Sequence, residues 1–101
     1  MAVEPLSRKE IEERLSELPG WTLDGGRLTR SYRLDSHFAA TALVVHVAQI
    51  QQELDHHSEL TLGYHTVTLA VHTHSAGGAV TRLDVELARR VEEAAPAHGA
   101  R

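Results

Sequence analysis

Cysteine is absent from this sequence of 101 residues, and it has only one tryptophan, two tyrosines and one phenylalanine. Without cysteine the chain can form neither disulfide bonds nor thiolate metal sites. No stretch approaches the roughly 20 apolar residues of a membrane-spanning helix. Residues 1–10 also lack the basic-then-apolar order of a secretory signal. We therefore expect a cytoplasmic protein with no membrane partner.

The length predicts a single domain over residues 1–101, with a core over about residues 5–95. A core of this size is modest, so association into a homo-oligomer is an expected further source of stability. The formal net charge is −4, and apart from Arg89-Arg90 the lysines and arginines are scattered. A nucleic-acid partner is not expected, because such binding needs a clustered basic surface.

Two helices in the N-terminal half have recognisable start signals. Ser7-Arg8-Lys9-Glu10 has the Ser-x-x-Glu form of a capping box. It predicts a helix over residues 7–18 that ends at Pro19-Gly20. Ser36 can cap a second helix, whose apolar positions repeat at intervals of three and four up to about Leu54.

Strands are predicted between and after these helices. Gly25-Gly26 is a two-residue turn signal flanked by apolar residues at even spacing, so residues 21–34 are predicted to form a β-hairpin. Residues 61–73 are rich in β-branched side chains, with Gly63 as a break. They fit two further strands or one long bent strand.

A third helix is predicted after the glycine pair Gly77-Gly78. Thr81 and Asp84 form a candidate cap, and the helical spacing of apolar residues continues to Pro96. Residues 96–101 are expected to be a frayed tail. The order is therefore α-β-β-α-β-β-α, which predicts an α+β fold with helices packed on one face of an antiparallel sheet.

Histidine is abundant, with eight in the chain and five of them between Asp55 and His74. Imidazole titrates near neutral pH, so this cluster indicates proton transfer, metal binding or pH sensing. His56 and His57 follow the predicted second helix, and His74 shares with His72 the strand face opposite the core. The residues alone leave His56, His57 and His74 open between a chemical role and ordinary exposed positions.

Other chemistries fit the sequence less well. His72-x-His74 resembles part of a zinc site, but the chain has no cysteine and no His-Glu-x-x-His motif. No serine lies in a Gly-x-Ser-x-Gly elbow. We therefore predict neither a metal site nor a serine nucleophile. The histidines to which we assign no function, as solvated side chains, are His37, His46, His65 and His98.

Motifs throughout the chain resemble those of one enzyme family. They are Asp55-His56-His57-Ser58, Tyr64, Val67, Leu69, Thr73-His74, Gly77-Gly78, Thr81, Asp84 and Leu87-Ala88, together with Trp21, Arg27-Leu28-x-Arg30 and Phe38-x-x-x-Ala42. This set is similar to the signature of the pterin-4a-carbinolamine dehydratases, over about residues 5–93. The resemblance implies a four-stranded antiparallel sheet with helices on one side, and homodimers that can pair into homotetramers.

The resemblance also implies an activity. The family removes water from 4a-hydroxytetrahydropterin, which aromatic amino-acid hydroxylases produce, and yields quinonoid dihydropterin in pterin cofactor recycling. No cofactor is implied, because the pterin is the substrate. His57 and His74 would be the proton-transfer groups nearest the C4a hydroxyl and N5, and His56 would orient the pterin or act as a further acid-base group.

The remaining site residues implied by the resemblance have supporting or binding roles. Asp84 would either hold an imidazole in one tautomer or only cap a helix, and the two interpretations stay open. Asp55 has the same ambiguity. Backbone groups around three neighbouring residues would bind the polar edge of the pterin; they are Thr73, Ser75 and Ala76.

Three departures from the family pattern stand out. Ser58 replaces a common proline, so the turn after the histidine pair loses a fixed φ angle and is expected to be looser. The stretch before Asp84 is one residue longer than usual, around Ala79-Val80. Gln52, a further supporting residue, stands where some relatives have a glutamate, and an amide can bond but not take a proton. The alternative function is a non-catalytic protein-binding or assembly factor on the same scaffold.

Overall fold

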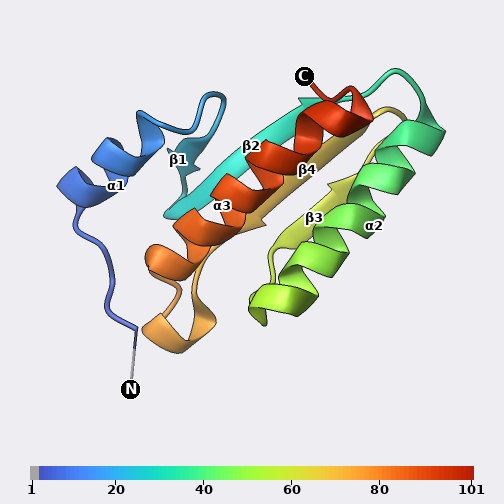
Figure 1. Cartoon of the computed structure of the whole chain (residues 1–101). Coiled ribbons are helices and arrows are strands. Elements are labelled where there is room, and N and C mark those ends of the chain that lie inside the picture. The colour runs from blue at the N-terminus through green and yellow to red at the C-terminus, as the bar shows by residue number, and fades with distance from the viewer. Residues whose placement is uncertain (1–2) are drawn as a thin grey trace.

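The computed structural model describes residues 3–101 and contains three α-helices and four strands. In chain order the elements are α1 (Arg8–Leu15), β1 (Thr22–Asp24), β2 (Arg27–Arg33), α2 (His37–Leu54), β3 (Glu59–Leu62), β4 (Thr66–Val71), the 3-10 turn η1 (His74–Ala76), α3 (Arg82–Ala94) and the 3-10 turn η2 (Ala95–His98). The strands form one antiparallel sheet in the order β1-β2-β4-β3 (Figure 1). The α+β class and the order α-β-β-α-β-β-α are confirmed.

The helix starts follow the local capping signals. Ser7 Oγ accepts from the Glu10 amide at 3.1 Å, and the Glu10 carboxylate accepts from the Ser7 amide at 2.9 Å. Ser36 caps α2 through the Ala39 amide. However, α1 ends three residues before the predicted position 18, because the chain then tightens into 3-10-type bonds such as that from the Leu18 amide to the Leu15 carbonyl.

The predicted hairpin is present. Gly25 and Gly26 both have positive φ angles, 59° and 80°. This is the backbone geometry of a tight turn whose twist matches the flanking strands, and glycine adopts it without a Cβ clash. Leu23 and Leu28 consequently lie opposite each other in β1 and β2.

The second β region forms two strands rather than one bent strand. Strand β3 begins at Glu59, two residues before the predicted start, and Gly63 ends the pairing with β4. A Cβ at Gly63 would lie 2.4 Å from Oγ1 of Thr66. A side chain there would therefore require the Thr66 side chain to move.

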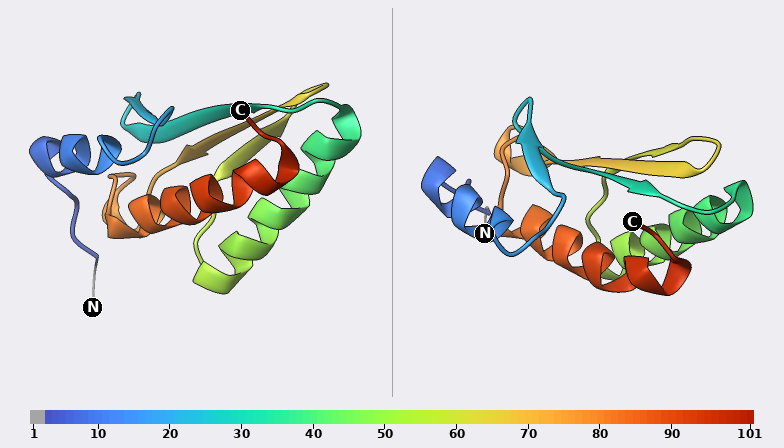
Figure 2. Two further views of the ribbon diagram at one scale, coloured as in Figure 1. Left: turned by 45° about the horizontal axis from the view of Figure 1, so that its top comes forward. Right: turned by 90° about the horizontal axis from the view of Figure 1, so that it is seen from above.

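The helices α2 and α3 cover one face of the sheet, as Figure 2 shows. Along β4 the side chains alternate, with Val67, Leu69 and Val71 fully buried toward the helices and the intervening residues partly exposed on the other face. Burial of each such side chain contributes about 1.5–3 kcal/mol. The helical residues that meet them and are buried to at least 97% are Leu43, Val47, Ile50, Leu87 and Val91.

No helix in residues 3–101 is long and apolar enough to cross a membrane.

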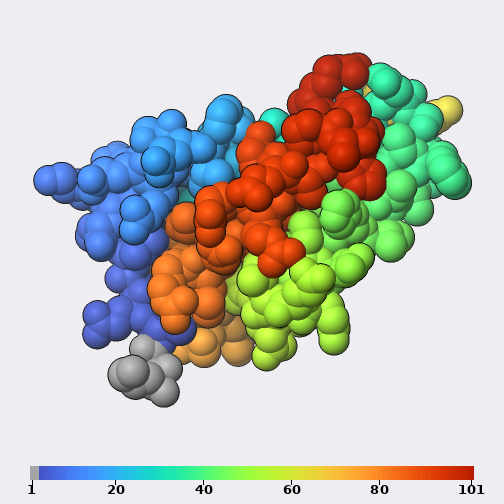
Figure 3. All heavy atoms as spheres, viewed as in Figure 1, coloured from blue at the N-terminus to red at the C-terminus, as the bar shows by residue number. Residues whose placement is uncertain are grey.

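The C-terminal residues expected to be a frayed tail are held against the body of the protein. The amides and carbonyls of Arg33 and Arg101 exchange two hydrogen bonds of 2.9 Å, which hold Arg101 beside the last residue of β2. His46 Nδ1 and His98 Nε2 lie 2.8 Å apart, so these two histidines contact each other instead of being fully solvated. The tail and α3 lie beside α2 on the surface seen in Figure 3. This docking depends on residues distant in sequence, which a local pattern does not reveal.

Candidate active site

The histidine pair is positioned by the way α2 ends. Asp55, the C-cap residue, has a left-handed backbone conformation with φ 51° and ψ 43°, and its amide donates to carbonyls of the last helical turn. This conformation stops the helix and redirects the chain toward the sheet. His56 and His57 therefore face the end of β4 and the start of α3, where His74 and Asp84 lie.

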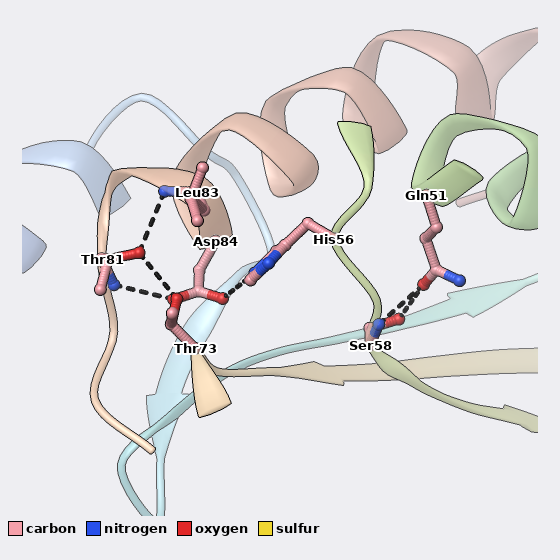
Figure 4. Close-up of polar contacts among 7 residues, drawn as sticks. All are labelled: Gln51, His56, Ser58, Thr73, Thr81, Leu83 and Asp84. Carbon is pink, nitrogen blue, oxygen red and sulfur yellow. Dashed lines mark hydrogen bonds and ion pairs between the residues drawn. The ribbon is translucent and has the colours of Figure 1, made fainter. Parts of the chain in front are cut away.

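Asp84 joins two of these segments. Nε2 of His56 lies 2.6 Å from Oδ1 of Asp84, and the side chains are 10% and 0% exposed. The other carboxylate oxygen, Oδ2, accepts from the Thr81 amide at 2.7 Å and from the Thr73 hydroxyl at 2.8 Å (Figure 4). Asp84 is thus both the N3 residue of the α3 capping box and the partner of an imidazole, through different oxygens. The two interpretations of Asp84 that the sequence left open, a helix cap and an imidazole partner, are therefore compatible.

The hydroxyl groups beside Asp84 have a consistent direction of donation. Because the Thr73 hydroxyl donates to the carboxylate, it accepts from the Thr81 hydroxyl, 2.7 Å away. Thr81 Oγ1 accepts in turn from the Leu83 amide at 3.2 Å. Both hydroxyls of this buried cluster donate and accept, and both carboxylate oxygens accept, which compensates for removing the carboxylate from water. With its Nε2 donating to Asp84, a neutral His56 keeps the lone pair on Nδ1.

Two adjoining hollows lie beside these residues. The first, of about 350 Å³, is here called the His56 lobe and is lined by Asp55, His56, His57, His72, Thr73, His74, Ser75 and Leu83. The second, of about 290 Å³, is called the Arg27 lobe and is lined by Arg27, His57, Ser58, Glu59, Ala70, His72 and His74. Three histidines are common to both, namely His57, His72 and His74. The two lobes therefore form one groove with imidazoles at the junction.

Most of the site residues named from the sequence meet here. His56, His57 and His74 line the His56 lobe with Asp55, Thr73 and Ser75. His74 belongs to η1 and not to the strand, yet it still lies beside His72. Asp84 bonds to His56 but lines neither lobe. Ala76 lines neither lobe, and its amide donates to the Thr73 carbonyl at 3.1 Å.

Gln52 is the residue that the structure does not bring to the site. It is exposed, lines neither lobe, and has no side-chain hydrogen bond within residues 3–101. Its neighbour Gln51 is buried, and Oε1 of Gln51 accepts from the Ser58 amide at 2.9 Å and from the Ser58 hydroxyl at 2.5 Å. The turn expected to be looser without proline is thus tied to α2. A signal was present, because Gln51 follows the buried Val47 by four residues.

Several further residues of the groove were not assigned a role from the sequence. His72 lines both lobes, and its Nδ1 is buried without a hydrogen-bond partner in the described chain. Arg27 and Glu59 form an ion pair of 2.7 Å in the Arg27 lobe, and Leu83 supplies an apolar wall to the His56 lobe. The shared strand face of His72 and His74 was a usable signal for His72. No local pattern connects Arg27 with Glu59, which lie on separate strands.

Within residues 3–101 no group of three or more histidine, aspartate or glutamate side chains is arranged to hold a metal ion.

Comparison with known proteins gives one family. The family model described as pterin 4 alpha carbinolamine dehydratase matches residues 4–94. Relatives from Streptomyces coelicolor and Streptomyces avermitilis are 78% and 74% identical over 99% of this chain and 99% of their own lengths. Both are provisionally named pterin-4-alpha-carbinolamine dehydratases.

Two solved structures share the fold. A transcriptional coactivator/pterin dehydratase from Brucella melitensis has a TM-score of 0.82 at 33% identity, covering 88% of this chain and 96% of its own. A pterin dehydratase-like protein, identified as a RuBisCO assembly factor in the alpha-carboxysome, has a TM-score of 0.62 at 18% identity, covering 73% and 87%. At that identity the second likeness concerns the fold alone.

Proposed function

The chain belongs to the pterin-4a-carbinolamine dehydratase family, and we propose that it is a hydro-lyase that converts 4a-hydroxytetrahydropterin to quinonoid dihydropterin and water. The observation that carries this proposal is the groove with three imidazoles at the junction of its two lobes. A fourth imidazole, that of His56, lines one lobe and bonds to the buried carboxylate of Asp84. No metal or nucleotide is needed for this elimination.

The reaction requires two proton movements. The bond between C4a and its hydroxyl breaks, the departing hydroxyl takes up a proton to leave as water, and N5 loses its proton as the N5=C4a double bond forms. A group that donates and a group that accepts must therefore reach neighbouring atoms of one ring. Imidazoles suit both tasks near neutral pH, and such acid-base catalysis contributes typically about 10²- to 10⁴-fold each.

We assign the two proton transfers to His57 and His74. Both side chains are exposed enough to meet a ligand, and both line the two lobes. One would protonate the C4a hydroxyl and the other would take the N5 proton. His56 is less exposed, and its Nε2 is engaged by Asp84, so it presents Nδ1 to the pterin as a fixed acceptor or as a further acid-base group.

Asp84 acts in this proposal as a positioning residue. Because it is held by Thr73 and Thr81 while it bonds to His56, the imidazole ring has little freedom to turn. Fixing one tautomer in this way makes the same nitrogen available for every turnover. The carboxylate itself does not line either lobe and touches no substrate.

The pterin ring is proposed to lie in the His56 lobe. The lobe contains one large apolar side chain, Leu83, against which a flat ring can pack, and polar groups of Asp55 and Ser75. Thr73 also lines the lobe, but its amide, carbonyl and hydroxyl already bond within the protein. Flat ligands are oriented by a few accurately placed polar contacts of this kind. Ala76 supports the turn that carries Ser75 instead of contacting the pterin, since its amide is already bonded.

A homodimer or homotetramer is part of the proposal. Four large apolar side chains remain exposed in the described chain: Phe38 at 85%, Tyr64 at 76%, Val45 at 64% and Leu62 at 40%. Phe38 and Val45 are seven residues apart and so share one face of α2. Strand β3 is also an edge strand. An exposed apolar surface beside an open sheet edge favours self-association. The cytoplasmic location remains a prediction from the sequence.

A direct assay tests the activity. The 4a-hydroxytetrahydropterin is generated in place by an aromatic amino-acid hydroxylase, and its absorbance is followed with and without this protein. The proposal requires decay faster than the spontaneous dehydration, in proportion to protein concentration. Equal decay in both samples refutes it. The alternative, a non-catalytic protein-binding or assembly factor, then predicts a complex of fixed stoichiometry with another protein.

A further inference from the structure

We propose that His72 is a further catalytic residue, whose Nε2–H donates a hydrogen bond to the C4a hydroxyl of the substrate as that group leaves. The inference rests on the proposed dehydratase function and adds to the same groove a group that transfers no proton. It depends on the surroundings of the two ring nitrogens of His72, on its place in the groove and on the electron demand of the departing hydroxyl.

His72 lies where the two lobes meet. It follows Val71, the last residue of β4, and like His57 and His74 it lines both lobes. Those two histidines are the proposed proton-transfer groups, so the reacting atoms C4a and N5 belong at this junction. A substrate placed there meets the side chain of His72 as well.

The two ring nitrogens of His72 have different surroundings. Nδ1 is buried and has no hydrogen-bond partner within residues 3–101. Nε2 has no protein partner there either, but it is not buried, so a ligand in the groove can reach it. A buried N–H without an acceptor is rarer in proteins than a buried acceptor without a donor. The neutral ring is therefore expected to carry its proton on Nε2, which makes that nitrogen a donor.

The buried Nδ1 also indicates that this imidazole does more than fill space. A buried polar atom without a partner destabilises the folded chain, and an apolar group of the same shape in its place is neutral or stabilising. The side chain of His72 holds no other residue by a hydrogen bond within residues 3–101. Since packing alone would favour a phenylalanine here, we attribute the imidazole to the donor at Nε2.

The reaction supplies an acceptor for this donor. As the bond between C4a and oxygen breaks, its electron pair moves to the oxygen, which takes up one proton from the general acid. A second lone pair on the same oxygen stays free to accept a hydrogen bond. Because negative charge develops on the oxygen as the bond breaks, a donor at that lone pair stabilises the transition state more than the bound substrate. His57 and His74 keep the two proton transfers, and His72 neither gains nor loses a proton.

Replacement of His72 by phenylalanine removes both nitrogens and keeps the shape of the ring. We expect kcat to fall about 10- to 100-fold, less than for a full oxyanion because the leaving oxygen is also protonated. KM should change little, as for an interaction made mainly in the transition state. The urea midpoint should equal or exceed that of the wild type, because the unpartnered Nδ1 is gone.

His72→Gln separates hydrogen-bond donation from proton transfer. The glutamine amide carries N–H donors but cannot act as an acid or a base near neutral pH. Its Nε2 has a reach similar to that of the imidazole Nε2, so most of the kcat lost in His72→Phe should return. A glutamine variant no more active than the phenylalanine variant overturns the donor role.

A binding measurement adds a readout without turnover. A 7,8-dihydropterin has no hydroxyl at C4a, so it lacks the group that His72 is proposed to contact. Its affinity, measured by titration calorimetry, should be the same for His72→Phe and for the wild type. An affinity that falls as much as kcat would mean that His72 holds the pterin ring, and it overturns the proposed contact.

The matched control is His65→Phe. His65 is also half-buried with an unpartnered, buried Nδ1, but it lines neither lobe. This variant should share any rise in the urea midpoint and leave kcat unchanged. A wild-type kcat in His72→Phe overturns the role of His72 while the dehydratase activity stands. A wild type no faster than the spontaneous dehydration overturns the proposed function, and this inference with it.

Discussion

Nε2 of His56 and Oδ1 of Asp84 lie 2.6 Å apart, although 28 residues separate them in the chain. The contact connects the segment after α2 to the first turn of α3. Since Asp84 also caps α3, the same carboxylate contributes to the stability of a helix and to the orientation of a site imidazole. Changes at this residue should therefore affect stability and turnover together, whereas changes at its partners should separate the two.

Asp84→Asn tests this double role. The asparagine amide is uncharged and can accept at only one oxygen, so we expect an unfolding free energy lower by about 1–3 kcal/mol. The loss of a fixed His56 tautomer should lower kcat by about 10- to 100-fold, with a smaller effect on KM. Urea denaturation and the pH profile of kcat measure the two effects.

The matched variant for Asp84 is Thr81→Val. It removes the hydroxyl contacts to Thr73 and the Leu83 amide but leaves the bond between His56 and Asp84. It should lower stability while kcat stays within about threefold of the wild type, because an acceptor of the helix cap is lost and no site group is freed. An equal loss of kcat in both variants would contradict the positioning role.

His57→Ala and His74→Ala test the assignment of the proton transfers. Each should lower the catalysed rate by about 10²- to 10⁴-fold, because each removes one acid-base group. The measurement is the decay of the carbinolamine above its spontaneous rate. His37→Ala, at the exposed start of α2, is the control and should retain full activity. Wild-type rates in both site variants would show that the protons move through other groups.

Gln51→Ala and Gln52→Ala separate two neighbouring amides. Gln51 ties Ser58 to α2 by two hydrogen bonds, so its loss should lower the unfolding free energy by about 1–2 kcal/mol and reduce kcat as the His56-His57 turn loosens. Gln52 is exposed, and its replacement should stay within about 0.5 kcal/mol. Thermal unfolding and the dehydratase assay give the comparison. A larger loss of activity in Gln52→Ala would restore the role expected from the sequence.

Tyr32 makes the free energy of unfolding depend on pH in the alkaline range. Burial, with the hydrogen bond to Glu92 at 2.6 Å, raises the pKa of Tyr32 above its usual value. The unfolded chain therefore releases this proton first, so the stability that Tyr32 contributes is complete below about pH 10 and declines as the pH rises further. Tyr32→Phe should flatten the decline in urea midpoints above about pH 10. Tyr64→Phe, exposed by 76%, should retain it.

Phe38→Ser tests the proposed self-association. The side chain is 85% exposed, so within one subunit its removal should cost less than about 0.5 kcal/mol. If the surface of Phe38 and Val45 is buried between copies, the variant should have a lower molar mass than the wild type in light scattering after size exclusion. Lys9→Ser, on the exposed face of α1, is the control. A wild type that is monomeric at micromolar concentration would contradict the oligomer proposal.

The amino-acid sequence by itself determined the local structure of this protein. The capping boxes at Ser7 and Thr81 and the glycine pair in the hairpin act over at most four residues, so their contacts form wherever the local chain folds. The resemblance to a family also points to His56, His57 and His74 from the sequence alone. These features required no knowledge of how distant segments meet.

Only the tertiary structure decided which side chains share the groove. The left-handed turn at Asp55 sets the direction of the chain after α2, and that direction brings His56 to Asp84. Likewise the strand order β1-β2-β4-β3 brings Arg27 and Glu59 together across β4. Such contacts join residues about 30 positions apart, and they depend on the packing of whole elements. No local pattern specifies that packing.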